Sequence, residues 1–583
     1  MKSIPLPSLS RSDSDFWPTG GYWRGSPWLP TSYMAIKALD ARAGRDDFAL
    51  ARRLARETVF GMFETYRAVE PHTIWECYSP TEAKPGTYAK KPGYSRPEFC
   101  GWSALGPISL FIEDVIGVKQ ADAFANRLVC DFPEAPVGRV GVENYRFGKV
   151  VCDIVATAGE IAVESNAPFT LVADGREHAV SAGANRFRRA EDAEGKPHAE
   201  CAERKPHAED AEFAEFSSHS PSERGGARNA PFDPPPSERG VARSAGGSTP
   251  CGSRLSPSSS AWRDALPRPV FDEWPELVDF YYKAWDIAHT HIVNVPGLPM
   301  PRYMDCGHRS DRIWIWDTCF MALYCKYAPQ EFPGIESLEN FYSLLLDDDG
   351  RPLPKVVGNR WCGEEEGRML DFMVHHPDNP PLFAWTELSY ALQTGDRARL
   401  EKVYADKRWL PRWFDLFDSF DPDAPKPRGT CVQVKLRRCA DGYHWAGCPS
   451  GMDNTPRGRT PQCPSGDGGR CPDNPDLLWI DAFAQQGLSA LCLSRIAAIL
   501  GRDAEADDWR VRWASIRDKV NALYWDDADG FYYDILSTDH SKVKVATIAS
   551  YWPLLAGMPE PSQAERLIAK LEDPRFFDSI CVG

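Results

Sequence analysis

The sequence lacks any run of 18 apolar residues, although 43% of its 583 residues are hydrophobic and can fill a large core. A membrane-spanning helix needs about 20 such residues, so no membrane partner is expected. The start, MKSIPLPSLSRSD, has one Lys and no apolar signal-peptide core. A net charge of −16 without a basic cluster argues against nucleic acid as a partner. These absences predict a cytoplasmic protein.

The chain also lacks a CxxC pair, and its 17 Cys are scattered and odd in number. Neither a disulfide framework nor a zinc site is therefore indicated. Reduced thiols that serve as small core residues are the favoured interpretation. One local bridge among Cys448, Cys463 and Cys471 remains an alternative.

Large apolar residues are scarce from about Arg188 to Ser260, where short duplications such as PSERGGAR and PSERGVAR occur. Such a stretch cannot bury enough surface to offset its ordering entropy, which predicts a long disordered linker over residues 188–265. A coil of about 75 residues has an end-to-end distance on the order of 50 Å. It could therefore join distant ends of one domain without strain.

Helical periodicity is strong on both sides of this linker. Apolar residues recur at spacings of three and four at Ala506, Trp509, Trp513, Ile516, Val520 and Leu523. The preceding apolar stretch from Ile480 ends at Gly501, which predicts two helices joined by a short turn. A further helix is expected around Leu277 to Ile287. Repeated helical hairpins with aromatic connections indicate an all-α toroid.

A different pattern occupies residues 121–187. Ile161 and Val163 alternate with polar neighbours, as do Phe169 and Leu171, and Gly or Asn breaks follow every several residues. This alternation predicts a small β appendage. It is expected to cover part of the helical barrel, with a carbohydrate-binding role as the alternative.

Two acidic residues are candidates for the pair of carboxyl groups that glycosidic hydrolysis needs. Asp453 lies in CPSGMDNTPRG, where Gly451 permits a tight turn and Pro456 breaks any helix. Glu76 lies in VEPHTIWECYSPT beside Trp75 and Tyr78. Taken alone, each acid is more simply a solvated or salt-bridged surface group, and only the surrounding motifs favour catalysis.

Taken together, several motifs give the chain a family resemblance. It resembles glycoside hydrolase family 63, which includes processing α-glucosidases and mannosylglycerate or glucosylglycerate hydrolases, and is more distantly similar to trehalases. The strings that carry the resemblance are RIWIWDTCFM, NPPLFAW, SGMDNTPRGR, PDLLWIDAFAQQ, GGYWRGSPWLPTSYM, TIWECYSPT and FCGWSALGPI.

The resemblance implies an (α/α)6 barrel and an inverting mechanism with no cofactor and no metal. It implies that Asp453 is the general acid and Glu76 the general base. It also implies a substrate-binding set for a small carbohydrate: Arg302, Trp316, Asp317, Trp385, Trp23, Arg24 and Trp75.

Structural roles remain alternatives for several of these residues. Trp316 and Trp385 could be ordinary core aromatics, and Asp317 could cap a helix. Arg24 could be a stacked or salt-bridged arginine.

The order of the motifs departs from the family pattern, because TIWECYSPT precedes SGMDNTPRGR. Read from Val270 to Gly583 and then from Met1 to Phe187, the chain resembles one uninterrupted hydrolase, which suggests a circular permutation. Residues 1–120 would then form the C-terminal half of the barrel and residues 266–583 the N-terminal half. A fusion of two tandem gene copies is the alternative.

The resulting functional hypothesis is an inverting α-glycosidase that hydrolyses a small α-glucoside or α-mannoside. The alternatives are a non-catalytic carbohydrate-binding protein or inactive fused gene product, and a glycoside phosphorylase. The phosphorylase is disfavoured because a base such as Glu76 would be unnecessary if phosphate attacked. The sequence does not indicate an oligomeric state.

Overall fold

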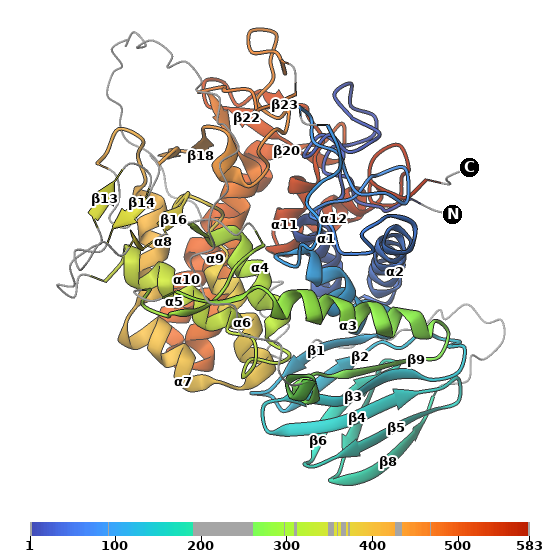
Figure 1. The fold of residues 1–583 in the computed structure, drawn as a ribbon. Coiled ribbons are helices and arrows are strands. Elements are labelled where there is room, and N and C mark those ends of the chain that lie inside the picture. Colours follow the sequence, from blue (N-terminus) through green and yellow to red (C-terminus); the bar gives the residue numbers. More distant parts are fainter. Residues whose placement is uncertain are drawn as a thin grey trace. The chain divides into compact units, whose positions relative to one another are not determined.

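The computed structural model describes residues 3–42, 44–90, 92–189, 260–295, 298–307, 312–347, 355–357, 360–362, 369–370, 373–425, 434–466 and 468–580. The predicted disordered linker lies almost wholly outside these residues. The parts of the chain before and after it form one compact unit. This unit is mainly helical and also contains sheets (Figure 1).

The helices come from both segments of the chain. Those before the linker are α1 (Leu29–Arg42), α2 (Arg45–Ala68) and the π-helix η2 (Gly106–Ile116). The α- and π-helices after it are α3 (Pro275–His289), α4 (Ile315–Cys325), α5 (Gly334–Leu345), α6 (Phe383–Thr394), α7 (Arg397–Leu400), η5 (Glu401–Asp406), α8 (Trp409–Ser419), α9 (Ile480–Ile499), α10 (Asp503–Lys519), η7 (Val520–Tyr524), α11 (Trp552–Leu555) and α12 (Pro561–Ile568).

The predicted helical hairpin near the C-terminus is confirmed. Helix α10 buries Ala506, Trp509 and Trp513 on one face, as their spacing requires, and packs against α9. Gly501 makes the turn between the two helices with a φ of +75°, a backbone conformation that glycine adopts at little cost. Helix α9 is buried on nearly every side, so it forms a central element of the core.

The β unit has two sheets that pack face to face. One sheet has the order β1-β2-β6-β7 and the other β8-β5-β4-β3-β9. Rings of Phe147 and Phe169 meet edge-on between them at 5.3 Å. The strands are β1 (Val118–Asp122), β2 (Arg127–Cys130), β3 (Val140–Phe147), β4 (Val150–Ala156), β5 (Glu160–Ser165), β6 (Phe169–Ala173), β7 (Arg176–Val180), β8 (Gly183–Arg188) and β9 (Arg268–Phe271).

This β unit exceeds the small appendage that the sequence predicts over residues 121–187. It begins at Val118 and recruits β9 from beyond the linker, where Val140 of β3 pairs with Phe271. The four residues of β9 are too few to show a period of two, and their pairing partner is remote in sequence. The segment from residue 266 onward therefore contributes to the sheet as well as to the helices.

Short strands connect the helices elsewhere, and several lie in loops around the helix ends (Figure 1). They are β10 (Ile292–Asn294), β11 (Arg302–Met304), β12 (Arg312–Trp314), β13 (Lys355–Val357), β14 (Arg360–Cys362), β15 (Met369–Leu370), β16 (Met373–His375), β17 (Leu436–Cys439), β18 (Gly442–Trp445), β19 (Leu477–Leu478), β20 (Trp525–Asp526), β21 (Phe531–Tyr532), β22 (Asp534–Leu536) and β23 (Lys542–Val543).

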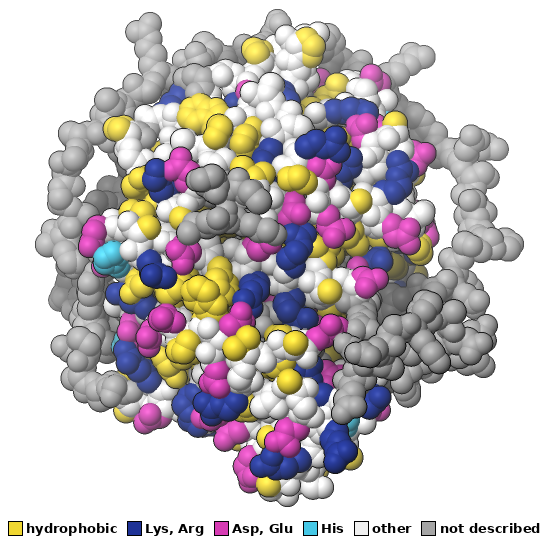
Figure 2. Space-filling model, turned by 90° about the vertical axis from the view of Figure 1, so that its right-hand side faces the viewer, with side chains coloured by type: hydrophobic (Ala, Val, Ile, Leu, Met, Phe, Trp, Pro, Cys, Tyr) yellow, Lys and Arg dark blue, Asp and Glu magenta, His cyan; other side chains and the backbone are white. Residues whose placement is uncertain are grey.

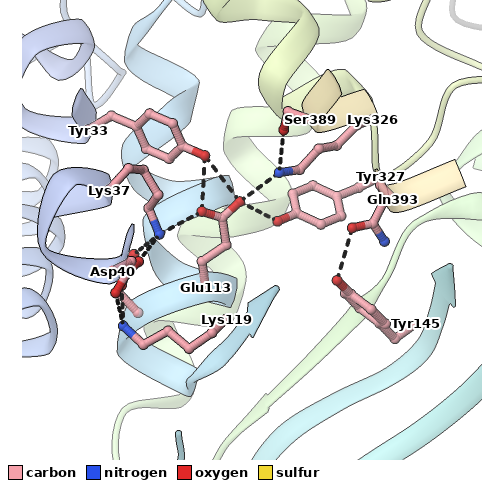
Figure 3. Close-up of polar contacts among 11 residues, drawn as sticks. Tyr33, Lys37, Asp40, Glu113, Lys119, Tyr145, Lys326, Tyr327, Ser389 and Gln393 are labelled. Carbon is pink, nitrogen blue, oxygen red and sulfur yellow. Dashed lines mark hydrogen bonds and ion pairs between the residues drawn. The ribbon is translucent and has the colours of Figure 1, made fainter. Parts of the chain in front are cut away.

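A buried polar network joins the segments before and after the linker (Figure 3). The Glu113 carboxylate of η2 pairs with Lys37 at 2.8 Å and with Lys326 at 3.1 Å. It also accepts hydrogen bonds from the hydroxyls of Tyr33 and Tyr327. Burial alone would raise the pKa of Glu113, but Lys326 and Lys37 outweigh it and hold that pKa below its usual value. Glu113 is therefore a charged link between α1, η2 and the end of α4.

The two ends of the described chain lie side by side (Figure 1). The Ser3 amide donates to the Ile580 carbonyl at 2.9 Å, and the Ile580 amide donates to the Ser3 hydroxyl at 3.0 Å. Arg53 of α2 pairs with Asp578 at 2.7 Å. The start and the end of the chain are thus neighbours at the same place in the fold.

Acidic and basic side chains are interspersed over the face shown in Figure 2. In the part of the chain that the structure describes, no helix combines the length and apolarity needed to cross a membrane. Cys463 and Cys471 are both free thiols, so these two do not form the local bridge considered above.

Candidate active site

Glu76 lies on the loop that follows α2, and backbone contacts fix its position. Its amide donates to the Arg96 carbonyl at 2.8 Å, and its carbonyl accepts from the Trp102 indole at 2.9 Å. The side chain is buried, with a residue exposure of 1%. A buried carboxylate requires hydrogen-bond donors, and the surrounding loop supplies them.

The two oxygens of the Glu76 carboxylate have different partners. Oε2 accepts from the Tyr88 hydroxyl at 2.5 Å and from the Arg96 amide at 3.2 Å. Oε1 has the Tyr22 hydroxyl at 3.4 Å, which is long for an O–H···O hydrogen bond. The carboxylate is therefore held firmly through one oxygen and loosely through the other.

Asp453 lies on the turn after Gly451, which has a φ of +81°. A Cβ at Gly451 would lie 3.1 Å from the Trp316 indole, so glycine also allows the loop to approach that ring closely. The Asp453 carbonyl accepts from the Cys471 amide at 3.0 Å. The acid-bearing loop is thus seated against α4.

The next residue, Asn454, joins this loop to the N-terminal segment. Its side chain accepts from the Trp23 amide at 2.8 Å and donates to the Gly21 carbonyl at 3.0 Å. The Arg24 guanidinium donates to the Asn454 carbonyl at 3.2 Å. Strings that are far apart in sequence, GGYWRG and SGMDNTPRG, are therefore hydrogen-bonded to each other.

Two carboxylates, Glu76 and Asp317, act electrostatically on Asp453. Burial, together with the charges of Glu76 and Asp317, raises the pKa of Asp453 to about 7. Burial and the charges of Glu76 and Asp453 also raise the pKa of Tyr22 well above its usual value. Asp453 itself is only half-buried. This half-buried residue therefore has a carboxyl group that stays protonated to near neutral pH.

Two of the predicted sugar-binding tryptophans, Trp316 and Trp385, both pack against Trp552. Trp316 of α4 lies 6.3 Å from Trp552, and Trp385 of α6 lies 6.1 Å from the same ring at 86°. Trp385 is half-buried, whereas Trp316 is buried. Trp552, which opens α11 directly after Tyr551, is not among the residues predicted from the sequence. Asp317, in the first turn of α4, belongs with this group through its charge on Asp453.

The remaining predicted substrate-binding residues make stacking, ion-pair or hydrogen-bond contacts with other residues of the protein. Trp23 stacks on Trp28 at 4.2 Å with parallel rings, and Trp75 meets Tyr94 edge-on. Arg24 pairs with Asp15 at 3.1 Å. Arg302 of β11 donates to the Glu331 carbonyl. Among the described residues, no contact joins Arg302 to Asp453 or Glu76, whereas Arg24 contacts the Asp453 loop through the Asn454 carbonyl.

A buried arginine, Arg457, ties the loop that carries Asp453 to two buried aspartates. Arg457 binds both oxygens of Asp481, at 2.7 and 2.9 Å, and both of Asp534, at 2.8 and 2.6 Å. Its guanidinium lies over the Trp479 ring at 4.5 Å. Sequence reasoning missed this cluster, since Arg457 and its two partners lie on three separate stretches of the chain.

Tyr22 and Tyr88 were also missed. Two glycines precede Tyr22, which itself has a φ of +65° and so carries a strained backbone that neighbouring contacts must maintain. Nothing in the string GTYAKKPGY sets Tyr88 apart from its neighbours. Among the described residues, no group of three or more His, Cys, Asp or Glu is placed to hold a metal ion.

Comparison with known proteins gives one family match. Residues 373–581, which include Asp453, match the family described as the mannosylglycerate hydrolase MGH1-like glycoside hydrolase domain. An uncharacterized protein of Borreliella burgdorferi is 33% identical over 274 residues, which cover 46% of this chain and 48% of that protein. The chain thus spans about half the length of this relative.

Two further similarities are weaker. A cytosolic neutral trehalase of Kluyveromyces lactis is 27% identical over 63 residues, which cover 11% of this chain and 8% of the trehalase. The mannosylglycerate hydrolase of Thermus thermophilus, solved in complex with glucose, is 19% identical, with coverage of 44% of this chain and 68% of that chain and a TM-score of 0.32. Over residues 373–581, the chain is therefore similar to the MGH1-like glycoside hydrolase domain.

Proposed function

We propose that this protein is an inverting α-glycosidase on an (α/α)6 barrel, with Asp453 as general acid and Glu76 as general base. The observation that carries the proposal is the raised pKa of Asp453, about 7, beside the charge of Glu76. An acid catalyst must be protonated at the working pH, and a base catalyst must be ionised. The raised pKa of Asp453 supports its role as the acid, and the hydrogen bonds of Glu76 from Tyr88 and the Arg96 amide support its role as the base.

In this mechanism, Asp453 protonates the glycosidic oxygen as the bond to the sugar breaks. Glu76 removes a proton from a water molecule that attacks the anomeric carbon from the opposite face. An inverting site needs about 6.5 to 9.5 Å between the two carboxyl groups so that the water fits. We expect this separation, with a water on Glu76, in a complex with an unreactive substrate analogue.

The proposed substrate is a small α-glucoside or α-mannoside. The matching family is described by a mannosylglycerate hydrolase, and one of the relatives named above is a trehalase. The half-buried Trp385 offers aromatic surface of the kind that stacks on sugar rings, and the buried Trp552 packs edge-on against it. Asp317, in the first turn of α4, is a carboxylate of the kind that accepts from sugar hydroxyls.

An assay of the purified full chain against a panel of α-glucosides and α-mannosides tests the proposal. The anomer of the first product is followed by NMR, and release of the β-anomer is expected for an inverting enzyme. Release of the α-anomer would contradict the inverting mechanism. Saturable sugar binding without turnover would favour the carbohydrate-binding alternative, and phosphate-dependent cleavage the phosphorylase.

We also propose that the unusual motif order is a circular permutation. The hydrogen bonds between Ser3 and Ile580 support it, because the old junction of a permuted domain must lie where the present ends meet. The single compact unit formed by both segments supports it too. A fusion of two incomplete gene copies would not require the ends to pair.

Reversing the permutation should leave the fold and the activity of the protein unchanged. Joining Gly583 to Met1 through a short Gly/Ser bridge and opening the chain between Glu191 and Ser260 is expected to give a soluble protein with unchanged specific activity. The packing contacts stay the same, and loop closure contributes only a modest entropy that grows slowly with length. Solubility, circular dichroism and the glycosidase assay measure the outcome.

The matched control is a chain cut in the linker but not rejoined at the ends. Its two pieces are held together by non-covalent contacts alone. This cut chain should therefore be less stable than the rejoined chain. An insoluble rejoined chain beside a soluble cut one would contradict the permutation.

A further inference from the structure

The loop from Cys77 to Arg96 returns to its own starting point beside Glu76. The Gly86 amide donates to the Cys77 carbonyl at 3.0 Å, and the Ser95 amide donates to the Gly86 carbonyl at 2.7 Å. A bridge between Thr87 and Tyr94 closes the tip. Tyr88 follows Thr87 directly, so these contacts set where the Tyr88 ring lies.

A second segment fixes the loop from the other side. The Tyr22 amide donates to the Thr87 carbonyl at 2.7 Å, and the Gly21 amide donates to the Thr87 hydroxyl at 3.2 Å. The rings of Tyr22 and Tyr88 pack 5.2 Å apart, and Tyr22 meets Trp28 edge-on at 4.7 Å. Both phenols are therefore placed by packing as well as by their hydroxyl contacts.

We infer that Tyr88 is a positioning residue that anchors Oε2 of Glu76 and leaves Oε1 as the oxygen that activates water. This inference rests on the proposed function, because it assigns a role within that reaction. Oε2 already accepts from the Tyr88 hydroxyl at 2.5 Å and from the Arg96 amide at 3.2 Å. Oε1 has only the long Tyr22 contact of 3.4 Å among the described residues, so it retains capacity to accept a water proton.

The Tyr88 phenol stays protonated, and so remains a hydrogen-bond donor to Glu76, over the working pH range. Burial and the charge of Glu76 raise its pKa above the usual value, so it stays protonated over the range in which the enzyme would work. Tyr22, Cys77 and Asp453 also have electrostatic links to Glu76. Among the described residues, Tyr88 and the Arg96 amide are the donors to Oε2, so removing the Tyr88 hydroxyl leaves that oxygen with the Arg96 amide.

Tyr88→Phe tests the inference because it keeps the ring and removes the donor. We expect kcat to fall about 10-fold or more with little change in KM, because a misoriented base slows the chemical step and not substrate binding. The pH below which activity is lost should also move upward, since a donor to the ionised carboxylate has gone. A role in packing alone would leave the pH profile unchanged.

Tyr94→Phe is the matched control in the same loop, since Tyr94 is 42% exposed and does not donate to Glu76. It should retain the rate and the pH profile. Equal melting temperatures of the two variants would exclude a difference in folding. If Tyr88→Phe behaves like Tyr94→Phe while Glu76→Gln is inactive, the inference is wrong and the proposed function stands.

The crystal structure of the Tyr88→Phe variant tests the same point without an assay. The Glu76 carboxylate should rotate or occupy two orientations once Oε2 loses the phenol. An unchanged single orientation would overturn the inference even if the protein hydrolyses nothing on the panel. Wild-type inactivity, in contrast, bears on the proposed function alone.

Discussion

Asp453→Asn and Glu76→Gln are each expected to lower kcat by a factor of about 100 or more. Each substitution keeps the size of the side chain and removes the group that exchanges a proton. Steady-state kinetics on the best substrate of the panel measures the effect. Near-normal turnover in either variant would mean that the proposed role of that residue is wrong.

Matched controls lie on or near the same two loops. The controls are Asp473→Asn, near the loop that carries Asp453, and Glu82→Gln, in the loop from Cys77 to Arg96; both native side chains are exposed. Neither control should change kcat or KM by more than about twofold, the size expected of surface substitutions away from the chemistry. A large loss in a control would point to loop disruption and not to lost proton transfer.

The pH dependence follows from the raised pKa of Asp453. Turnover should decline as the pH rises through about 7, because Asp453 then loses the proton that it must donate. Its pKa is above the unfolded value, so its contribution to stability falls as the pH rises from about 4 to about 7. Asp453→Asn should therefore be no less stable than the wild type at neutral pH.

The second large effect is a loss of stability, and it is expected when Arg457 is replaced. Arg457→Met should reduce the free energy of unfolding by about 3 to 5 kcal/mol, because it leaves the buried carboxylates of Asp481 and Asp534 without their shared cation. The midpoint of urea-induced unfolding at pH 7 measures the loss. Because burial raises the pKa of Asp481, the loss should shrink at lower pH as that carboxyl becomes neutral.

Arg459→Met is the control for this prediction. Arg459 lies two residues further along and pairs with Asp13 and Asp15, but its side chain is 23% exposed. Its removal should cost about 1 kcal/mol, as expected for a pair near the surface. Adding Asp481→Asn and Asp534→Asn to Arg457→Met should recover part of the loss. Equal losses for the two arginine variants would contradict the argument.

Much of the local structure could be predicted from the sequence. The spacing of Trp509 and Trp513 and the position of Gly501 were sufficient to predict α9 and α10, because helix formation depends on neighbours three and four residues away. The alternation at Ile161 and Val163 indicated β5 for the same kind of local reason. The motif strings supplied the two acids as candidates and the family resemblance.

Only the tertiary structure decided which distant residues meet. It paired β9 with β3 across the linker, and it engaged Arg24 with Asp15 and Asn454. It also placed Tyr88 on Oε2 of Glu76 and assembled the Glu113 network from α1, η2 and the end of α4. Such contacts depend on how whole elements pack, and residue spacing along the chain carries no record of that packing. The sequence by itself therefore determined the α9–α10 hairpin, the strands with clear alternation and the candidate acids, whereas the fold determined the partners that set their charge and orientation.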